Sequence, residues 1–270
     1  MRRSEHLAQV KKLLDEIVAR YHRAEFIGDD PVRCVHDFHN EEDIETAGFI
    51  TAALSYGRAV SIRNSVDRVL GVLGNSPHEA VLNFDPIKDG KRLCEFAHRF
   101  TTCEDLIQFI ELTSAVLRDH RRLKNVFLSL DNPEQPIREA MSALVKEFRS
   151  GTLFLRKHVE YLLPDPADGS ACKRFNLYLR WMVRGNDGVD FGLWPEVKPA
   201  RLVMPLDVHV GRISRKLGLL ERKSDDWKAA EEITESLRAF CPEDPLRYDF
   251  AITHIGITGI WEDVIGKLSG

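Results

Sequence analysis

Apolar residues recur at intervals of three and four along most of the chain, and strict alternation of apolar and polar residues is scarce. In segment 4–24, for example, Leu7, Val10, Leu14 and Ile17 fall on one helical face. The same periodicity predicts helices over ten further segments: 43–55, 59–74, 76–82, 104–119, 133–149, 154–162, 171–184, 207–217, 225–240 and 245–256. The pattern therefore predicts an all-α protein.

Three stretches lack this periodicity and are expected to be loops: 83–91, 162–170 and 185–200. The last contains three Gly and two Pro, and loops of that length in a compact domain are more often functional than accidental. Ser76-Pro77 and Asn132-Pro133 each place a proline after a residue that commonly caps helices. We therefore expect helices to begin at both places.

Composition agrees with a globular chain, since 43% of the 270 residues are hydrophobic and 30% are charged. No run of about 18 apolar residues occurs, and the charged, amphipathic N-terminal segment is unlike a signal peptide. We expect a cytoplasmic protein that does not contact membranes. Five scattered cysteines without a C-x-x-C pair favour reduced, buried thiols over a disulfide framework or a zinc site: Cys34, Cys94, Cys103, Cys172 and Cys241.

The net charge of −4 argues against a protein that coats nucleic acid indiscriminately. Charge is nevertheless uneven, because residues 172–216 contain nine Lys or Arg against four acids. A second basic cluster, "LRDHRRLK", spans residues 117–124. Each of these two regions could form a basic surface that binds phosphates, or it could be an ordinary solvated helix surface.

One candidate for chemistry is Asp207 in "PLDVHVGRISRKLGL". An aspartate before a helix commonly caps it by accepting backbone N–H groups. Here His209, Arg212 and Arg215 follow on the next turns. The opposite face is expected to be buried through three apolar residues: Val208, Ile213 and Leu217.

That segment resembles V-D-T-H-V-x-R-V-x-x-R-L-G-L in the helix–hairpin–helix DNA glycosylases, the superfamily of endonuclease III and 8-oxoguanine glycosylase. Upstream, "FITAALSYGRAVSIRNSVDRVL" resembles the early helix pair of that superfamily. Its Ser55-Tyr56 is closest to the archaeal 8-oxoguanine glycosylases, which have Gln where this chain has Gly57. Over its whole length the chain also resembles a prokaryotic family of unassigned activity, through "SYGRA", "CKRFNLYLRWMVR" and "DPLRYDFAI".

The glycosylase resemblance implies one helix–hairpin–helix unit over residues 1–270, with two helical subdomains and a cleft between them. Their approximate bounds would be 45–165 for one and 1–44 plus 166–270 for the other. It also implies that Asp207 is the catalytic carboxylate. The Gly-rich hairpin L-P-G-V-G-x-K/R-T-A is missing, with "GNDGVDFGLW" in its place. The archaeal members carry their reactive lysine at the start of a helix, which implies that role for Lys173.

By this resemblance the protein excises a damaged base from duplex DNA, with an oxidised purine as one candidate. Schiff-base AP-lyase activity follows if Lys173 attacks the sugar, and simple hydrolysis follows if water does. The four C-terminal cysteines of the iron–sulfur members are missing, so no cluster or other cofactor is expected, and we expect a monomer. Residues expected to contact DNA or the excised base are Tyr56, Arg58, Arg174, Arg180, Trp181, Arg184, Trp194, His209, Arg212 and Arg215.

Two other functions remain open. The chain could be a helix–hairpin–helix scaffold that binds DNA or a protein partner without catalysis. Alternatively, "CVHDFHNEEDIE" could hold a divalent metal through His36, Asp37 and His39 and hydrolyse phosphate esters. The same segment can also be explained without a metal, as a helix start at Asn40 with acids in the first turn.

Overall fold

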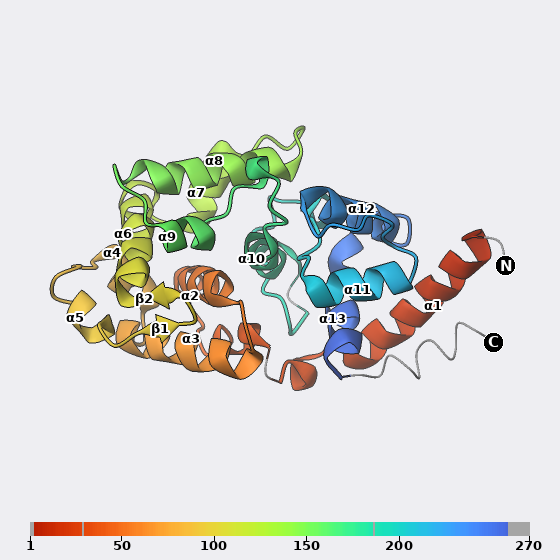
Figure 1. Cartoon of the computed structure of the whole chain (residues 1–270), viewed down its shortest axis with the longest axis horizontal. Coiled ribbons are helices and arrows are strands. Elements are labelled where there is room, and N and C mark those ends of the chain that lie inside the picture. The colour runs from red at the N-terminus through yellow and green to blue at the C-terminus, as the bar shows by residue number, and fades with distance from the viewer. Residues whose placement is uncertain (1–2, 29, 186, 259–270) are drawn as a thin grey trace. The chain divides into compact units, whose positions relative to one another are not determined.

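The computed structural model describes residues 3–28, 30–185 and 187–258. Helices dominate these residues (Figure 1), and one two-stranded sheet accompanies them. The prediction of a mostly helical protein is confirmed. The chain divides into two compact units: unit 1 is formed by Met1–Phe26 with Gly169–Gly270, and unit 2 by Ile27–Asp168.

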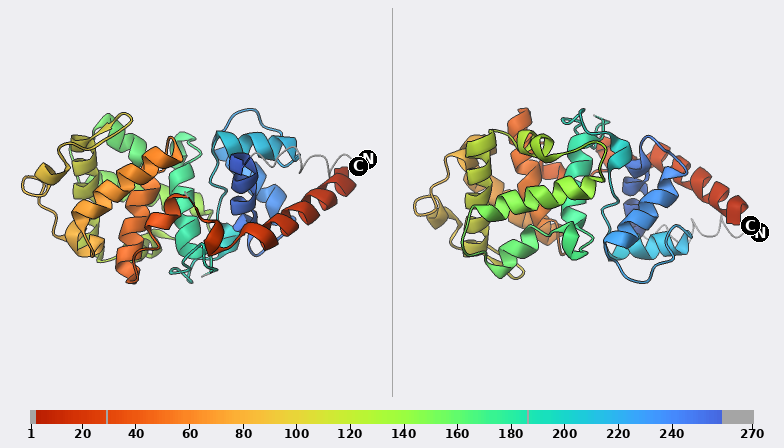
Figure 2. Two further views of the ribbon diagram at one scale, coloured as in Figure 1. Left: turned by 90° about the horizontal axis from the view of Figure 1, so that it is seen from below. Right: turned by 90° about the horizontal axis from the view of Figure 1, so that it is seen from above.

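Unit 1 is built from the two ends of the chain. Helix α11 packs against α13, and α13 also packs against α1 (Figure 2). Three tryptophans are fully or almost fully buried, namely Trp181, Trp194 and Trp227, and side chains of this size contribute much of the apolar area of a core. The elements of unit 1 are α1 (Arg3–Tyr21), η1 (Ala24–Phe26), α10 (Lys173–Val183), η4 (Pro199–Arg201), α11 (Val208–Lys216), α12 (Trp227–Arg238), η5 (Pro245–Tyr248) and α13 (Asp249–Thr258).

Unit 2 is arranged around helix α2, which is buried at every residue from Asp43 to Leu54. A helix that is apolar on most sides belongs inside a bundle, and α2 packs on α3, α4 and α7. Its Phe49 stacks between Phe109 and Phe148, with ring centroids 5.4 and 5.0 Å away. The helices of unit 2 are η2 (Pro31–Cys34), α2 (Glu41–Leu54), α3 (Ala59–Leu73), α4 (Pro77–Leu82), α5 (Gly90–Leu93), α6 (Cys103–His120), α7 (Leu123–Leu130), α8 (Ile137–Ser150), α9 (Lys157–Leu162) and η3 (Pro166–Asp168).

Unit 2 also contains a short antiparallel hairpin, β1 (Ala97–His98) and β2 (Thr101–Thr102). Its tip is Arg99 and Phe100. Each strand has two residues, which is too short to produce a detectable alternation of apolar and polar positions. This hairpin therefore leaves no periodic signal in the sequence and was not predicted.

Several boundaries differ from the predicted ones. Asn132-Pro133 does not open a helix, because α8 begins at Ile137 after the N-cap Pro136. Helix α7 was not predicted, since it starts inside the second basic cluster just after Arg121, whose φ of 69° ends α6. Pro77 does stand in the first turn of α4, as predicted.

The segment 27–44, which was assigned to the terminal subdomain, lies in unit 2. Its 3-10 turn η2 packs on both α2 and α3, and Val32 and Cys34 of that turn are buried. The packing of these side chains therefore assigns the segment to unit 2, as a correction to the predicted bounds.

Among the described residues, no helix combines the length and the apolar character needed to cross a membrane. All five cysteines are free thiols, but only Cys34 and Cys172 are buried, and Cys94 is exposed. The prediction of buried thiols is thus confirmed for Cys34 and Cys172 and wrong for Cys94, while Cys103 and Cys241 are only partly buried. Burial, reinforced by the neighbouring Asp67 carboxylate, raises the pKa of Cys34 to about 12, so this thiol is an unreactive part of the core.

Candidate functional site

Lys173 is the first residue of α10, at the start of a helix as predicted. Just before it, Cys172 adopts a left-handed conformation with φ 46° and ψ 37°, which non-glycine residues rarely adopt. The Cys172 amide donates to Ser170 Oγ at 3.2 Å, and its carbonyl accepts from the Asn176 amide. Both ends of the strained residue are therefore held, and strain of this kind is often found at functional sites.

Asp207 is the N-cap of α11, which confirms the predicted capping role. Its Oδ1 accepts hydrogen bonds from the backbone N–H groups of His209 and Val210, each at 2.9 Å. The helix ends at Lys216 with Leu217 as its C-cap, and the φ of 72° at the following Gly218 allows the Leu219 amide to donate to the Ser214 carbonyl. Local signals at both ends thus fix where α11 begins and stops.

The structure brings Lys173 and Asp207 together within unit 1. Lys173 Nζ lies 2.9 Å from Asp207 Oδ2, so the two carboxylate oxygens have different partners: Oδ1 caps the helix and Oδ2 binds the ammonium group. The side chains remain 34% and 28% exposed. A ligand in solvent can therefore reach both groups.

The surroundings of Asp207 favour its ionised form. Partial burial by itself raises the pKa of a carboxyl group, but the Lys173 ammonium and the Val210 N–H outweigh that effect, and the pKa of Asp207 is lowered below its usual range. The carboxylate is consequently charged at neutral pH. Such a group can stabilise positive charge that develops beside it.

The polar face of α11 only partly matches the predicted contacts. His209 and Arg212 are exposed. Arg215 pairs with Asp225 at 2.6 Å and donates to carbonyl oxygens of the following loop, so its guanidinium holds that loop in place. Val208, predicted to be buried, is 72% exposed, because the first turn of α11 projects it away from the core.

Two arginines predicted to contact DNA are instead buried in an ion network. Arg180 binds Asp190 and the Asp249 carboxylate, and Arg184 binds Asp190 as well as Asp244 in a bidentate arrangement. Both guanidinium groups are enclosed and neutralised by acids from the 185–200 loop and from the C-terminal segment. These arginines stabilise unit 1, and the prediction that they contact DNA phosphates is wrong.

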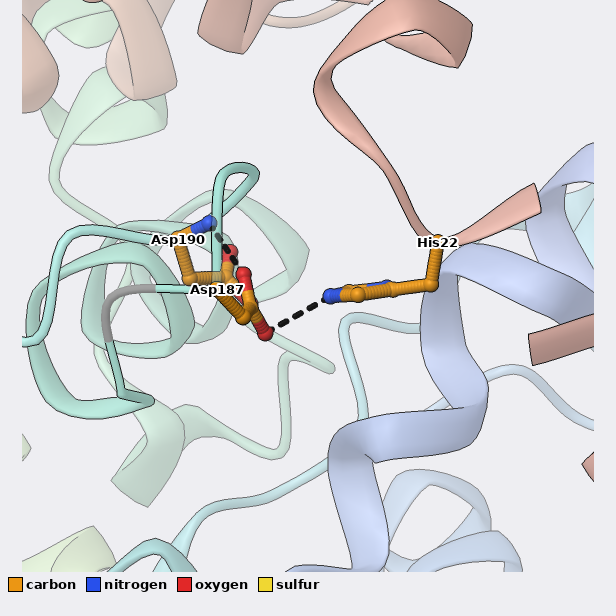
Figure 3. Close-up of side chains that lie close together, drawn as sticks. All are labelled: His22, Asp187 and Asp190. Carbon is orange, nitrogen blue, oxygen red and sulfur yellow. Dashed lines mark hydrogen bonds and ion pairs between the residues drawn. The ribbon is translucent and has the colours of Figure 1, made fainter. Parts of the chain in front are cut away.

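Figure 3 shows the edge of this network, where His22 Nε2 lies 2.7 Å from Asp187 Oδ2. Among the described residues, His22, Asp187 and Asp190 form the one group of three metal-ligand side chains within 4.8 Å of one another. However, Asp190 already binds two guanidinium groups. A divalent cation there would have to displace or repel these two charges, so the arrangement fits a structural network better than a metal site.

The two tryptophans predicted as pocket walls lie in the core. Trp181 and Trp194 are both 0% exposed, and Trp194 packs edge-on against Tyr178 at 5.5 Å. Arg174 is also buried. Helix α10 is buried at every residue from Arg174 to Val183, and Trp194 is buried in the loop that follows it, which corrects the predicted contact of these side chains with the nucleic acid.

Tyr56 and Arg58 lie in unit 2, at the junction of α2 and α3. Tyr56 is half-buried and forms part of an aromatic cluster, and Arg58 is the exposed N-cap residue of α3. The structure leaves both side chains at the surface of unit 2. Their predicted contact with DNA stays a prediction.

The His36, Asp37 and His39 cluster does not form a metal-ligand group in the structure. Asp37 pairs with Arg33 at 2.6 Å, and Asn40 caps α2 through its side chain. Part of the segment lines a pocket of about 630 Å³ in unit 2, with Asp43 and Asp67 among the other lining residues. Asp43, however, accepts from Ser76 and the His78 amide. Asp43 thus holds the start of α4 and Asn40 caps the start of α2, which favours a helix start over a metal site for this segment.

The acids that bind Arg180 and Arg184 lie far along the chain and were not predicted from the sequence. Asp249 is 69 residues from Arg180, and Asp244 is 60 residues from Arg184. No local pattern marks such pairs. The only available signal was the excess of cations in residues 172–216, which a folded core must neutralise when it buries them.

No curated protein and no solved structure matches this chain. A family model, described as a protein of unknown function (DUF2400), matches residues 30–258. This range covers most of the chain and includes both Lys173 and Asp207. The protein therefore belongs to the DUF2400 family.

Proposed function

We propose that this protein is a DNA base-excision glycosylase that uses Asp207 and Lys173, with a helix–hairpin–helix glycosylase-like fold. The observation that carries the proposal is the 2.9 Å approach of Lys173 Nζ to Asp207 Oδ2 at two adjoining helix starts. A nucleophilic amine and a charged carboxylate at one accessible position are what excision through a covalent intermediate requires.

Asp207 would act by electrostatics. Breaking the glycosidic bond builds positive charge on the sugar, and a carboxylate held beside it lowers the barrier. Because Oδ1 is fixed by two backbone N–H groups, the carboxylate is oriented before the substrate arrives. Preorganised charges of this kind change rates by roughly 100- to 1000-fold.

Lys173 would act first as an acid and then as a nucleophile. As the base leaves with the electrons of the glycosidic bond, a proton of the Lys173 ammonium moves to it. The neutral amine then forms a bond to the sugar carbon, and ring opening gives an iminium linkage. Loss of a proton from the sugar carbon next to the iminium, with departure of the phosphate one carbon further on, would then cleave the strand. Where water attacks in place of Lys173, the base is released without strand cleavage.

Exposed side chains on α11 would help to hold the backbone of the DNA. Arg212 and His209 follow Asp207 on the same helix and are exposed. Arginine next to a reacting sugar can bind a flanking phosphate. Affinity for duplex DNA is therefore expected to fall as salt concentration rises.

Borohydride trapping tests the proposal. The full chain is incubated with duplexes that carry an abasic site or an oxidised purine, and borohydride reduces any iminium to a stable secondary amine that retards the protein on a denaturing gel. We expect an adduct for the parent, none for Lys173→Gln, and a strongly reduced rate for Asp207→Asn. Lys11→Gln is the matched control, because Lys11 pairs with Asp15 at 2.6 Å elsewhere in unit 1.

The pattern of products separates the alternatives. Base release without an adduct would assign the attack to water. Duplex binding with neither adduct nor base release would contradict the enzyme proposal and favour a DNA-binding scaffold.

A further inference from the structure

Unit 2 has an exposed aromatic cluster formed by three separate elements. Tyr56 follows α2, Phe100 is at the tip of the hairpin, and Tyr161 is on α9. The Phe100 ring stacks on Tyr56 at 5.4 Å and meets Tyr161 edge-on at 4.9 Å. Phe100 and Tyr161 are 41% and 42% exposed, so the cluster presents ring surface to solvent.

Hydrogen bonds fix the position of this cluster. The Tyr56 hydroxyl donates to the His98 carbonyl at 3.1 Å and lies 2.5 Å from Thr101 Oγ1. The buried His98 ring in turn contacts the Tyr56 carbonyl at 2.9 Å and Ser65 Oγ at 2.9 Å. The hairpin is thereby attached to α3 and to the end of α2. A ligand that stacks on these rings would find them already ordered, which lowers the entropy cost of binding.

Arg99 gives the cluster a positive charge. It adopts φ 55° at the hairpin tip, a conformation that costs about 1 kcal/mol for a residue with a side chain. Its side chain lies over Gly57, where an added Cβ would be only 3.0 Å from Arg99 Cδ. Gly57, whose φ is 104°, therefore leaves room for Arg99.

Other basic side chains lie near the same rings. Arg58 is exposed one residue beyond Gly57. His158 lies 5.1 Å from the Phe100 ring, and both His158 and Arg156 contact the buried Asp105 carboxylate, at 3.1 and 2.6 Å. Rings flanked by arginines suit a polyanion with planar, aromatic groups better than they suit an aliphatic peptide.

We infer that the surface formed by Tyr56, Arg99, Phe100 and Tyr161 binds single-stranded or unstacked nucleic acid. A base stacks on Phe100 and Tyr161, and Arg99 contacts an adjacent phosphate. This inference goes beyond the proposed glycosylase activity and requires neither Lys173 nor Asp207. Base stacking on aromatic side chains tolerates all sequences, so little preference among bases is expected.

The test is binding of an undamaged, fluorescein-labelled single strand of about ten nucleotides to the full chain, followed by fluorescence anisotropy. Phe100→Leu is expected to weaken binding about five-fold or more, while Phe100→Trp retains it, because tryptophan keeps a stacking surface and leucine does not. Ile87→Ala is the control, since Ile87 is a 76% exposed apolar residue of unit 2 on another loop.

Arg99→Gly separates a binding role from a structural one. Glycine adopts the positive φ without strain, so the thermal midpoint is not expected to fall. The dependence of log K on log salt concentration should become shallower by about 0.7, which corresponds to one lost phosphate contact. A structural role alone would lower the midpoint and leave the salt dependence unchanged.

Three results would overturn the inference: no binding by the parent, equal binding by Phe100→Leu, or a change of oligomeric mass with Phe100→Leu in place of a change in binding. The last would identify the surface as a contact between copies of the chain. Because the strand carries no damaged base, none of these results depends on excision, and the trapping experiment is interpreted separately.

Discussion

Unit 1 contains two cation–carboxylate arrangements on the same helix, and they differ in exposure and in how completely their charges are satisfied. Lys173, at the first position of α10, shares Asp207 with a helix cap and stays 34% exposed. Arg180, seven residues later, is 3% exposed and is bound by two acids. The buried arrangement has no access to substrate and stabilises the fold. The exposed one keeps a charged carboxylate and an amine where a ligand can reach them.

The largest stability effect is expected at the buried arrangement. Arg180→Met would leave Asp190 and Asp249 buried without their shared cation, and losing one partner of a buried pair costs about 3 to 5 kcal/mol. Urea unfolding followed by circular dichroism measures this loss. A change below about 1 kcal/mol would mean that the network is far more hydrated than its burial indicates.

The largest effect on activity is expected at the exposed pair. Asparagine is as good an N-cap as aspartate, so Asp207→Asn should retain most of the stability of α11. It removes the charge, however, and the trapping rate should fall by roughly 100- to 1000-fold. Single-turnover trapping alongside urea unfolding gives both quantities. A variant as active as the parent would show that the charge of Asp207 has no role.

Asp207→Ala separates the cap from the charge. Alanine cannot accept the bonds that the amides of His209 and Val210 donate, so this variant should lose about 0.5 to 2 kcal/mol relative to Asp207→Asn. Their unfolding curves, compared at the same pH, give the difference. Identical stabilities would mean that water replaces the cap without cost.

Acid should remove the stabilisation that comes from the charge of Asp207. Burial tends to raise the pKa of this group, but Lys173 and the Val210 N–H lower it below the ordinary value near 3.8. A lowered folded-state pKa means that the stabilisation is fully present above the unfolded pKa and is lost as pH falls through the folded one. The stability difference between the parent and Asp207→Asn should therefore be constant above about pH 5 and shrink below about pH 4. A difference that grows on acidification would contradict this assignment.

The smallest effect is expected for a surface pair on α1. Lys11 and Asp15 are 42% and 35% exposed and four residues apart. Pairs of this kind contribute about 0.3 to 0.5 kcal/mol. Lys11→Gln should therefore change the free energy of unfolding by less than about 0.5 kcal/mol and leave trapping unchanged. A larger loss would show that Asp15, which also accepts from the Tyr248 hydroxyl, depends on Lys11 for its position.

Local signals allowed most helices to be predicted, because helical periodicity and caps such as Asp207 depend on residues a few positions apart. The same approach failed where the chain turns sharply at Arg121 or where elements are very short, as in the hairpin at 97–102. It placed the start of α8 four residues early, at Pro133 instead of Ile137.

The candidate site could be predicted only in part for a related reason. The sequence marks Lys173 and Asp207 through the resemblance, and the structure brings the two side chains together. The sequence alone, however, gives no sign that Trp181 is buried or that Arg184 binds an acid 60 residues away. Burial and long-range charge pairing are properties of the tertiary fold. A buried, ion-paired arginine and an exposed one therefore cannot be distinguished in the sequence.

The most direct measurement is to locate the trapped adduct on the protein. The parent is reacted with a duplex containing an abasic site in the presence of borohydride, digested with protease and nuclease, and analysed by mass spectrometry. We expect the residual sugar to be attached to Nζ of Lys173, the lysine bound to Asp207. The absence of any adduct, or its attachment to another lysine, would contradict the assignment of this pair as the reacting centre.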